Sequence, residues 1–152
     1  MSLLDDAYRR HLVLKTLASE ESARALADPS ALRHIAFEIV QIDDSAAKQK
    51  IETFFEDLGR RIDEVGFLDE FVAFETLLNE HRKQIRTTKG LRVSAAKNLA
   101  QYLRPINRNL ADSYELLKFE RNEIAHGLLT VRPLIATVIE EKQILENVLA
   151  AL

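Results

Sequence analysis

Residues 51–65 read IETFFEDLGRRIDEV, and their apolar side chains recur every three or four positions. This i, i+3, i+4, i+7 spacing places apolar side chains on one face of an α-helix. Gly66 is a point at which the helix could bend or break, and the pattern resumes from Phe67 to Leu78. We expect helical structure from the capping residues 43–45 to about Thr87. We also expect core positions for Phe54, Phe55, Phe67, Phe71 and Phe74.

Two further helices are expected on the N-terminal side. The first covers residues 2–27, with Ser2 as N-cap and with Asp5 and Asp6 in the first turn, where the helix dipole favours acids. Asp28 followed by Pro29 is a typical start signal, because aspartate caps a helix and proline fits its first position. A second helix then runs to about residue 42.

Three more helices are expected on the C-terminal side. One covers about residues 92–103 and ends near Pro105, because the residue before a proline is pushed out of the α region. The next begins with Asp112 or Ser113 as its cap and runs to Gly127. The last opens at Pro133 and carries an apolar stripe made of Leu134, Val138, Leu145, Leu149 and Leu152.

The composition agrees with long helices. The chain has 152 residues, of which 47% are hydrophobic and 30% charged, so it can bury a sizeable core. Four glycines and three prolines are too few for the many tight turns of an all-β protein of this length. We therefore predict a single all-α domain, residues 1–152, folded as an up-and-down helical bundle of five to seven segments.

Several kinds of site are disfavoured. The chain has no cysteine, no glycine-rich phosphate loop and no pair of histidines at metal-ligand spacing, so no metal or cofactor is expected. Acidic groups that include Glu70 and Glu75 are expected to be solvated helix faces. No apolar run reaches the roughly 18 residues that a transmembrane helix needs, and the N-terminus does not resemble a signal peptide. We expect a cytoplasmic protein.

Charge is distributed unevenly along the chain. From Asp43 to Glu80 there are eleven acids against four bases, whereas residues 81–111 contain eight bases and no acid. An asymmetry of this kind can mark a contact surface for nucleic acid. The basic segment could equally pack beside the acidic one within the fold. The sequence leaves both interpretations open.

Arg121 lies on the apolar face of the helix expected before Gly127. On a helical wheel it falls among Tyr114, Leu117 and Ile124, together with Leu128. A guanidinium on such a face is costly unless it is paired or opens onto a polar cleft. It could bond a carboxylate, extend its stem along the edge of the bundle, or serve a site.

His126 ends the same helix, and Gly127 stands where a residue just past the C-cap is expected. Asn122 lies one turn before His126, so the two side chains can hydrogen-bond. The dipole at a helix C-terminus also stabilises the cationic form of a histidine, which suits an acid–base role. Arg121 and His126 diverge by about 140° on a straight helix. A common site therefore needs a bend at Gly127 or a second chain.

The string ERNEIAHG at residues 120–127 resembles the signature of the HEPN superfamily. In that signature an arginine is followed directly by a polar residue, often asparagine, and then by a histidine after four to six positions. Arg121, Asn122 and His126 occupy these three places. The resemblance implies a helical bundle of about this length. Leu128 stands where some HEPN toxins carry a tyrosine that a partner nucleotidyltransferase modifies, so that modification has no acceptor here.

The resemblance also implies an activity. Many HEPN proteins are metal-independent endoribonucleases that act as homodimers, some in toxin–antitoxin or defence systems with an antitoxin or regulatory protein as partner. His126 would then be the general base or acid, Arg121 would bind the scissile phosphate, and Asn122 would orient the histidine or contact the phosphate. The acid-free segment would hold RNA through phosphate contacts from Arg82, Lys83, Arg86, Lys89 and Arg92.

A second interpretation belongs to another functional class. Many HEPN relatives have lost catalysis and serve as binding or dimerisation modules. Residues 106–117 are also similar to a stretch of the mannitol-operon-repressor-like helical proteins. The alternative is therefore a non-catalytic helical regulator or interaction module.

Overall fold

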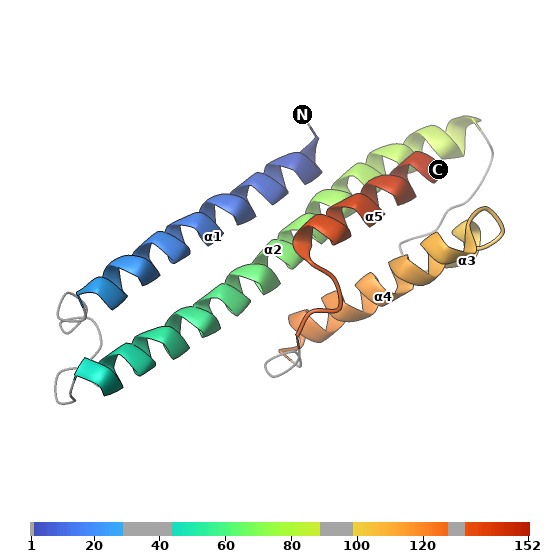
Figure 1. Cartoon of the computed structure of the whole chain (residues 1–152). Helices are drawn as coiled ribbons and strands as arrows, with labels where there is room; N and C mark the ends of the chain where they lie inside the picture. Colours follow the sequence, from blue (N-terminus) through green and yellow to red (C-terminus); the bar gives the residue numbers. More distant parts are fainter. Residues whose placement is uncertain (1, 29–43, 89–98, 128–132) are drawn as a thin grey trace. The chain divides into compact units, whose positions relative to one another are not determined.

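The chain is all-helical in the computed structural model (Figure 1), which describes residues 2–28, 44–88, 99–127 and 133–152, with the side chains of residues 45–81 in the second range. The described residues form five helices and no β-strand. The helices are α1 (Leu3–Ala27), α2 (Asp44–Thr88), α3 (Leu99–Leu103), α4 (Arg108–Ala125) and α5 (Val138–Ala151). The prediction of an all-α helical bundle is confirmed.

The helices contribute to two compact units. Unit 1 comprises Met1–Arg9 and Glu64–Leu152, and unit 2 comprises Arg10–Asp63. The long helices α1 and α2 pass through both units. The single domain expected from chain length stays a prediction.

Aromatic side chains of α2 form the centre of the core of unit 1. Phe67, Phe71 and Phe74 are buried, and the ring of Phe74 lies 5.7 Å from that of Tyr114 on α4, measured between centroids. Around them pack buried residues of the other helices: Leu4 and Ala7 of α1, Leu99 and Leu103 of α3, Leu117 of α4, and Leu145 and Val148 of α5. Burial of large apolar side chains, each contributing about 1.5–3 kcal/mol, holds the bundle together.

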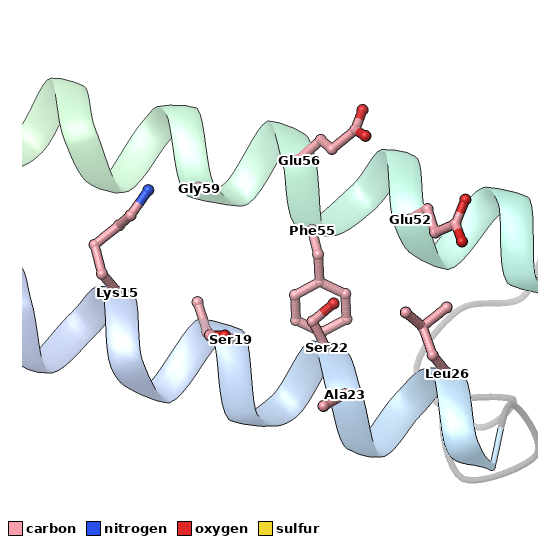
Figure 2. Close-up of a pocket in the computed structure, with 10 residues that line it drawn as sticks. Lys15, Ser19, Ser22, Ala23, Leu26, Glu52, Phe55, Glu56 and Gly59 are labelled. Carbon is pink, nitrogen blue, oxygen red and sulfur yellow. The ribbon is translucent and has the colours of Figure 1, made fainter.

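Unit 2 has a smaller apolar cluster. Ala25 of α1 and Ala47 and Ile51 of α2 are buried together, with Leu26 and Phe55 partly buried against them. Beside this cluster a shallow groove of about 570 Å³ runs between α1 and α2 (Figure 2). It is open because α1 presents the small side chains of Ser19 and Ser22 there, and α2 presents Gly59, which has no side chain. Phe54 is 59% exposed, so the expected core position was wrong for this residue.

A polar contact also joins the two helices of unit 2. The Nε2 atom of buried His11 lies 2.8 Å from Oδ1 of Asp63, and Nζ of Lys15 lies 3.2 Å from Oδ2 of the same carboxylate. Asp63 therefore ties two successive turns of α1 to α2.

Several expected helix boundaries are confirmed. Ser2 caps α1 through its hydroxyl, which accepts from the backbone N–H of Asp5, while the Asp5 carboxylate accepts from the N–H of Ser2. The helix α3 ends before Pro105, as the proline requires. The helix α2 continues through Gly66 without a break. One glycine costs a helix about 1 kcal/mol, which is less than the burial of Phe67 and Phe71 beside it contributes.

The start of α4 was predicted wrongly. Asn107, not Asp112 or Ser113, is the N-cap, and its side chain accepts from the N–H of Leu110 at 3.1 Å. The chain turns at Pro105, where the N–H groups of Ile106 and Asn107 both donate to the carbonyl of Leu103. Asn107 is the first good capping residue after this turn, so the helix begins there.

The start of α5 was also predicted wrongly. Pro133 does not open the helix, which begins after Thr137. Thr137 and Glu140 form a capping box, in which the N–H of Glu140 donates to the threonine hydroxyl and the N–H of Thr137 donates to the carboxylate.

The helix expected over residues 29–42 and the first part of the one expected from residue 92 lie outside the described residues. Within the described residues, no helix offers an apolar stretch of the length that a lipid bilayer requires.

Asn107→Ala should lower the free energy of unfolding by about 1 kcal/mol, because it leaves the N–H of Leu110 without its capping acceptor. Chemical denaturation followed by circular dichroism measures this change. Ser113→Ala is the control, since Ser113 lies inside α4 and should change stability by less than about 0.5 kcal/mol. A larger loss in the control than in Asn107→Ala would contradict the observed start of the helix.

Candidate functional site

The three residues of the Arg-Asn-x3-His motif lie in the last turn and a half of α4. His126 is the C-cap, and its backbone N–H donates to the carbonyl of Asn122 at 3.1 Å. Gly127 follows with φ of 69° and donates its N–H to the carbonyl of Ile124. A left-handed glycine just past the cap is the expected end of a helix, so this part of the prediction is confirmed.

Arg121 lies against the aromatic core of unit 1. Its Cζ atom is 5.7 Å from the centroid of the Phe71 ring, and its Nη2 atom donates to Oε1 of Glu75 at 3.2 Å. The arginine side chain is 29% exposed and that of Glu75 is 43% exposed. The guanidinium is therefore paired at the edge of the core and remains partly open to solvent.

His126 and Asn122 occupy a different face of α4. Both are exposed, and with Phe119, which is 53% exposed, they follow i, i+3, i+7 spacing. Among the described residues, no hydrogen bond or ion pair joins the side chain of His126 to Arg121 or Asn122. A single copy of α4 therefore presents the guanidinium and the imidazole on separate faces.

The basic segment is only partly described. Arg82, Lys83 and Arg86 fall in the last turns of α2, but their side chains, like Lys89 and Arg92, lie outside the described residues. Arg104 of the same segment is described, and its Nη2 atom bonds Asp112 at 3.3 Å and Glu115 at 2.8 Å. Arg104 therefore forms ion pairs with acidic residues of α4 and not with the acidic segment 43–80.

Three buried glutamates in unit 1 were missed from the sequence. Glu70 of α2, Glu120 of α4 and Glu141 of α5 are each at most 1% exposed. Glu70 had been expected on a solvated face, and this expectation was wrong. Within the described part of the chain, neither carboxyl oxygen of Glu70 or Glu141 has a hydrogen-bond partner. The only signal in the sequence was that each stands at helical spacing from apolar core residues.

Burial raises the pKa of each of these acids. Loss of solvation raises the pKa of Glu70 to about 8, against the attraction of Lys142. Burial also raises the pKa of Glu141 to about 11, and the nearby Glu70 and Glu120 add to that rise. The pKa of Glu120 is raised by burial too, although hydrogen bonds from the backbone of Ile135 and Ala136 oppose the shift. Glu70 and Glu141 are fully enclosed in the core, whereas Glu120 borders a hollow of about 360 Å³ between α4 and α5.

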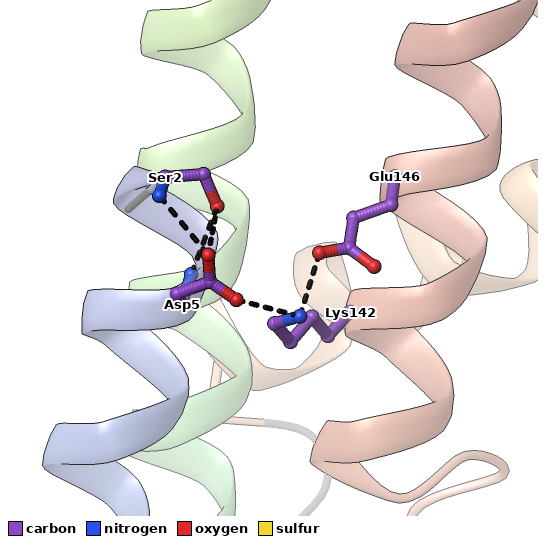
Figure 3. A network of polar contacts seen from close by, with 4 residues as sticks. All are labelled: Ser2, Asp5, Lys142 and Glu146. Atoms are coloured by element: carbon purple, nitrogen blue, oxygen red, sulfur yellow. Dashed lines mark hydrogen bonds and ion pairs between the residues drawn. The ribbon is translucent and has the colours of Figure 1, made fainter.

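Lys142, which opposes the rise in the pKa of Glu70, belongs to a network of polar contacts with Asp5, Ser2 and Glu146. Figure 3 shows these four residues. Nζ of Lys142 on α5 is 2.9 Å from Asp5 of α1 and 2.6 Å from Glu146. The hydrogen bond from Lys142, with those from Ser2, holds the pKa of Asp5 well below its usual range. The lysine charge is therefore shared by two carboxylates, which limits how far it can stabilise an ionised Glu70.

Among the described residues, no group of three His, Cys, Asp or Glu side chains could hold a metal ion.

Comparison of the chain with models of protein families, with curated proteins and with solved structures gave no match.

The buried glutamates should make the protein less stable as pH rises. Between the ordinary pKa of about 4.5 and the raised value, the folded chain holds a proton that the unfolded chain has released. The free energy of unfolding therefore falls by at most about 1.4 kcal/mol per pH unit for each group. Glu141→Gln removes this dependence, so its stability relative to wild type should increase steadily from pH 5 to pH 8.

Urea denaturation at several pH values measures this difference. Glu80→Gln, at an exposed position of α2, is the matched control and should run parallel to wild type. A Glu141→Gln curve that also runs parallel to wild type would show that Glu141 is ionised in the folded protein.

Proposed function

We propose that this chain is a HEPN-like, metal-independent endoribonuclease that cleaves RNA at an Arg/His site in a homodimer cleft. The observation that carries the proposal is the end of α4, where a partly open Arg121 and an exposed His126 stand five residues apart. The resemblance of residues 120–127 to the HEPN signature supplies the reaction. It also extends the proposal to a toxin–antitoxin or defence setting with a regulatory protein partner.

In this proposal His126 accepts the proton of a ribose 2′-hydroxyl while its oxygen attacks the adjacent phosphorus. The bond from phosphorus to the 5′-oxygen breaks, and the leaving oxygen takes a proton from His126 of the partner subunit. The products carry a 2′,3′-cyclic phosphate and a 5′-hydroxyl. Arg121 offsets the negative charge that grows on the phosphoryl oxygens.

A second subunit is needed because the two side chains diverge. Five residues along an ideal helix correspond to about 140° of rotation and about 7.5 Å of rise. An arginine from one α4 and a histidine from another can face the same phosphate without distorting either helix. The exposed Phe119, two helical turns before His126 on the same face of α4, offers apolar surface for such a contact.

The Arg121–Glu75 ion pair favours a second candidate, the non-catalytic interaction module. A guanidinium that is already paired with a carboxylate and packed on Phe71 can act as a structural link between α4 and α2. The exposed Leu116 and Phe119 would then be contact residues for a partner protein.

Cleavage of RNA by purified protein in the presence of a chelator separates the two candidates. Arg121→Ala and His126→Ala should each lower the rate by at least about 100-fold. Lys118→Ala, another base on α4, is the control and should keep the wild-type rate. Equal activity in all variants would indicate a contaminating nuclease, and an inactive wild type would favour the interaction module.

Glu75→Gln tests whether Arg121 binds phosphate. In a His126→Ala background, which prevents turnover, removal of the competing carboxylate should tighten RNA binding roughly threefold to tenfold, equivalent to about 1 kcal/mol. Fluorescence anisotropy with a labelled RNA measures the dissociation constant. Unchanged or weaker binding would argue that Arg121 serves only the fold.

A further inference from the structure

One side of α1 exposes a row of large apolar residues within unit 2. Val13 is 57% exposed, Leu14 44% and Leu17 52%. The side of α1 that faces α2 carries other residues, among them His11, Lys15 and Ala25. On a helical wheel the exposed row lies about 100° away from that side. The described residues of unit 2 therefore leave this face of α1 exposed.

Two leucines of this row, with a charged residue before and after them, have the spacing of a seam between paired helices. Arg10, Leu14, Leu17 and Glu21 are separated by four, three and four residues, so they form one narrow line along α1. A repeat of this kind is typical of the contacting positions of a coiled coil. The line has two leucines at its centre and opposite charges at its two ends.

That order of charges selects the partner and its direction. Suppose that a second α1 packs antiparallel about a two-fold axis between Leu14 and Leu17. Leu14 of each subunit then faces Leu17 of the partner subunit. Arg10 then lies opposite Glu21 of the partner subunit, and the symmetry makes this pair twice. A parallel arrangement would place like charges opposite one another, which is unfavourable. The seam is self-complementary in the antiparallel direction alone.

We propose that α1 is a homodimerisation surface, on which two copies of the chain pack antiparallel through Leu14 and Leu17 with Arg10 facing Glu21 at both ends. In the single chain both charged residues already have partners. Arg10 has an interaction of its own, and Glu21 bonds Arg24 at 2.9 Å, with the side chains of Glu21 and Arg24 53% and 71% exposed. An exposed pair of this kind contributes little and is readily exchanged. The proposal does not rest on the ribonuclease activity, because all its residues belong to unit 2.

The size of the seam predicts a reversible dimer. A few turns of a single helix pair bury less than the roughly 1,600 Å² of a standard interface. We expect dissociation in the micromolar range, so the dimer should be seen to form as concentration rises in sedimentation equilibrium of the full chain.

The first test removes the apolar centre. The double variant Leu14→Lys with Leu17→Lys should lose the association through α1 and form smaller assemblies than the wild type at the same concentration. Leu12→Lys is the matched control, because Leu12 is 43% exposed on another side of α1 and should leave the dimer unchanged. Circular dichroism checks that each variant stays folded. A double variant that self-associates to the same extent as the wild type does so through other surfaces, and this result overturns the proposal.

The second test reverses the charges. Arg10→Glu and Glu21→Arg should each weaken the dimer by about tenfold, because each creates like charges facing one another. The two changes together should restore dissociation to within about twofold of wild type, because the pair is re-formed in the opposite sense. A double variant no better than the singles would overturn the antiparallel arrangement. A wild type that is monomeric throughout, with the leucine variants less stable, would mean that the same chain covers the seam.

Discussion

Glu120 accepts hydrogen bonds from the backbone of Ile135 and Ala136, and this contact determines how the last two helices of unit 1 are joined. It satisfies the peptide groups just before α5, so the helix begins only after Thr137. Leu134 and Ala136 are thereby placed against the core. This contact requires the carboxyl group of Glu120 to be buried, which is unfavourable for its charged form. Glu70 and Glu141 are buried in unit 1 as well, and the low-dielectric interior favours the neutral form of all three acids.

Polar groups of unit 1 are thus divided by their surroundings. Enclosed acids face the core from three helices, whereas Lys142 and its two carboxylates form ion pairs at the edge. Arg121 stands between these cases, packed on Phe71 and paired with Glu75, yet partly open. This intermediate position is what allows one residue to support both the ribonuclease proposal and the structural alternative.

Features encoded by neighbouring residues could be predicted from the sequence. The cap at Ser2, the stop before Pro105 and the glycine after His126 depend on local backbone preferences, and all three are observed. The starts of α4 and α5 could not be predicted, because a reverse turn and a side chain from another helix select them. The burial of Glu70 could not be predicted either, since charge and spacing suit a solvated face equally well. The placement of Arg121 on the apolar face followed from periodicity, but its partner Glu75 is 46 residues away.

The neighbouring positions of Glu120 and Arg121 have a consequence for enzymology. Arg121 directly follows Glu120, which lies close enough to Glu141 to raise the pKa of that buried acid, and ionisation of Glu141 weakens the bundle. An alkaline limb in a pH–rate profile would then report the loss of folded enzyme and not the titration of a catalytic acid. Only rates corrected for the folded fraction at each pH would carry information about His126.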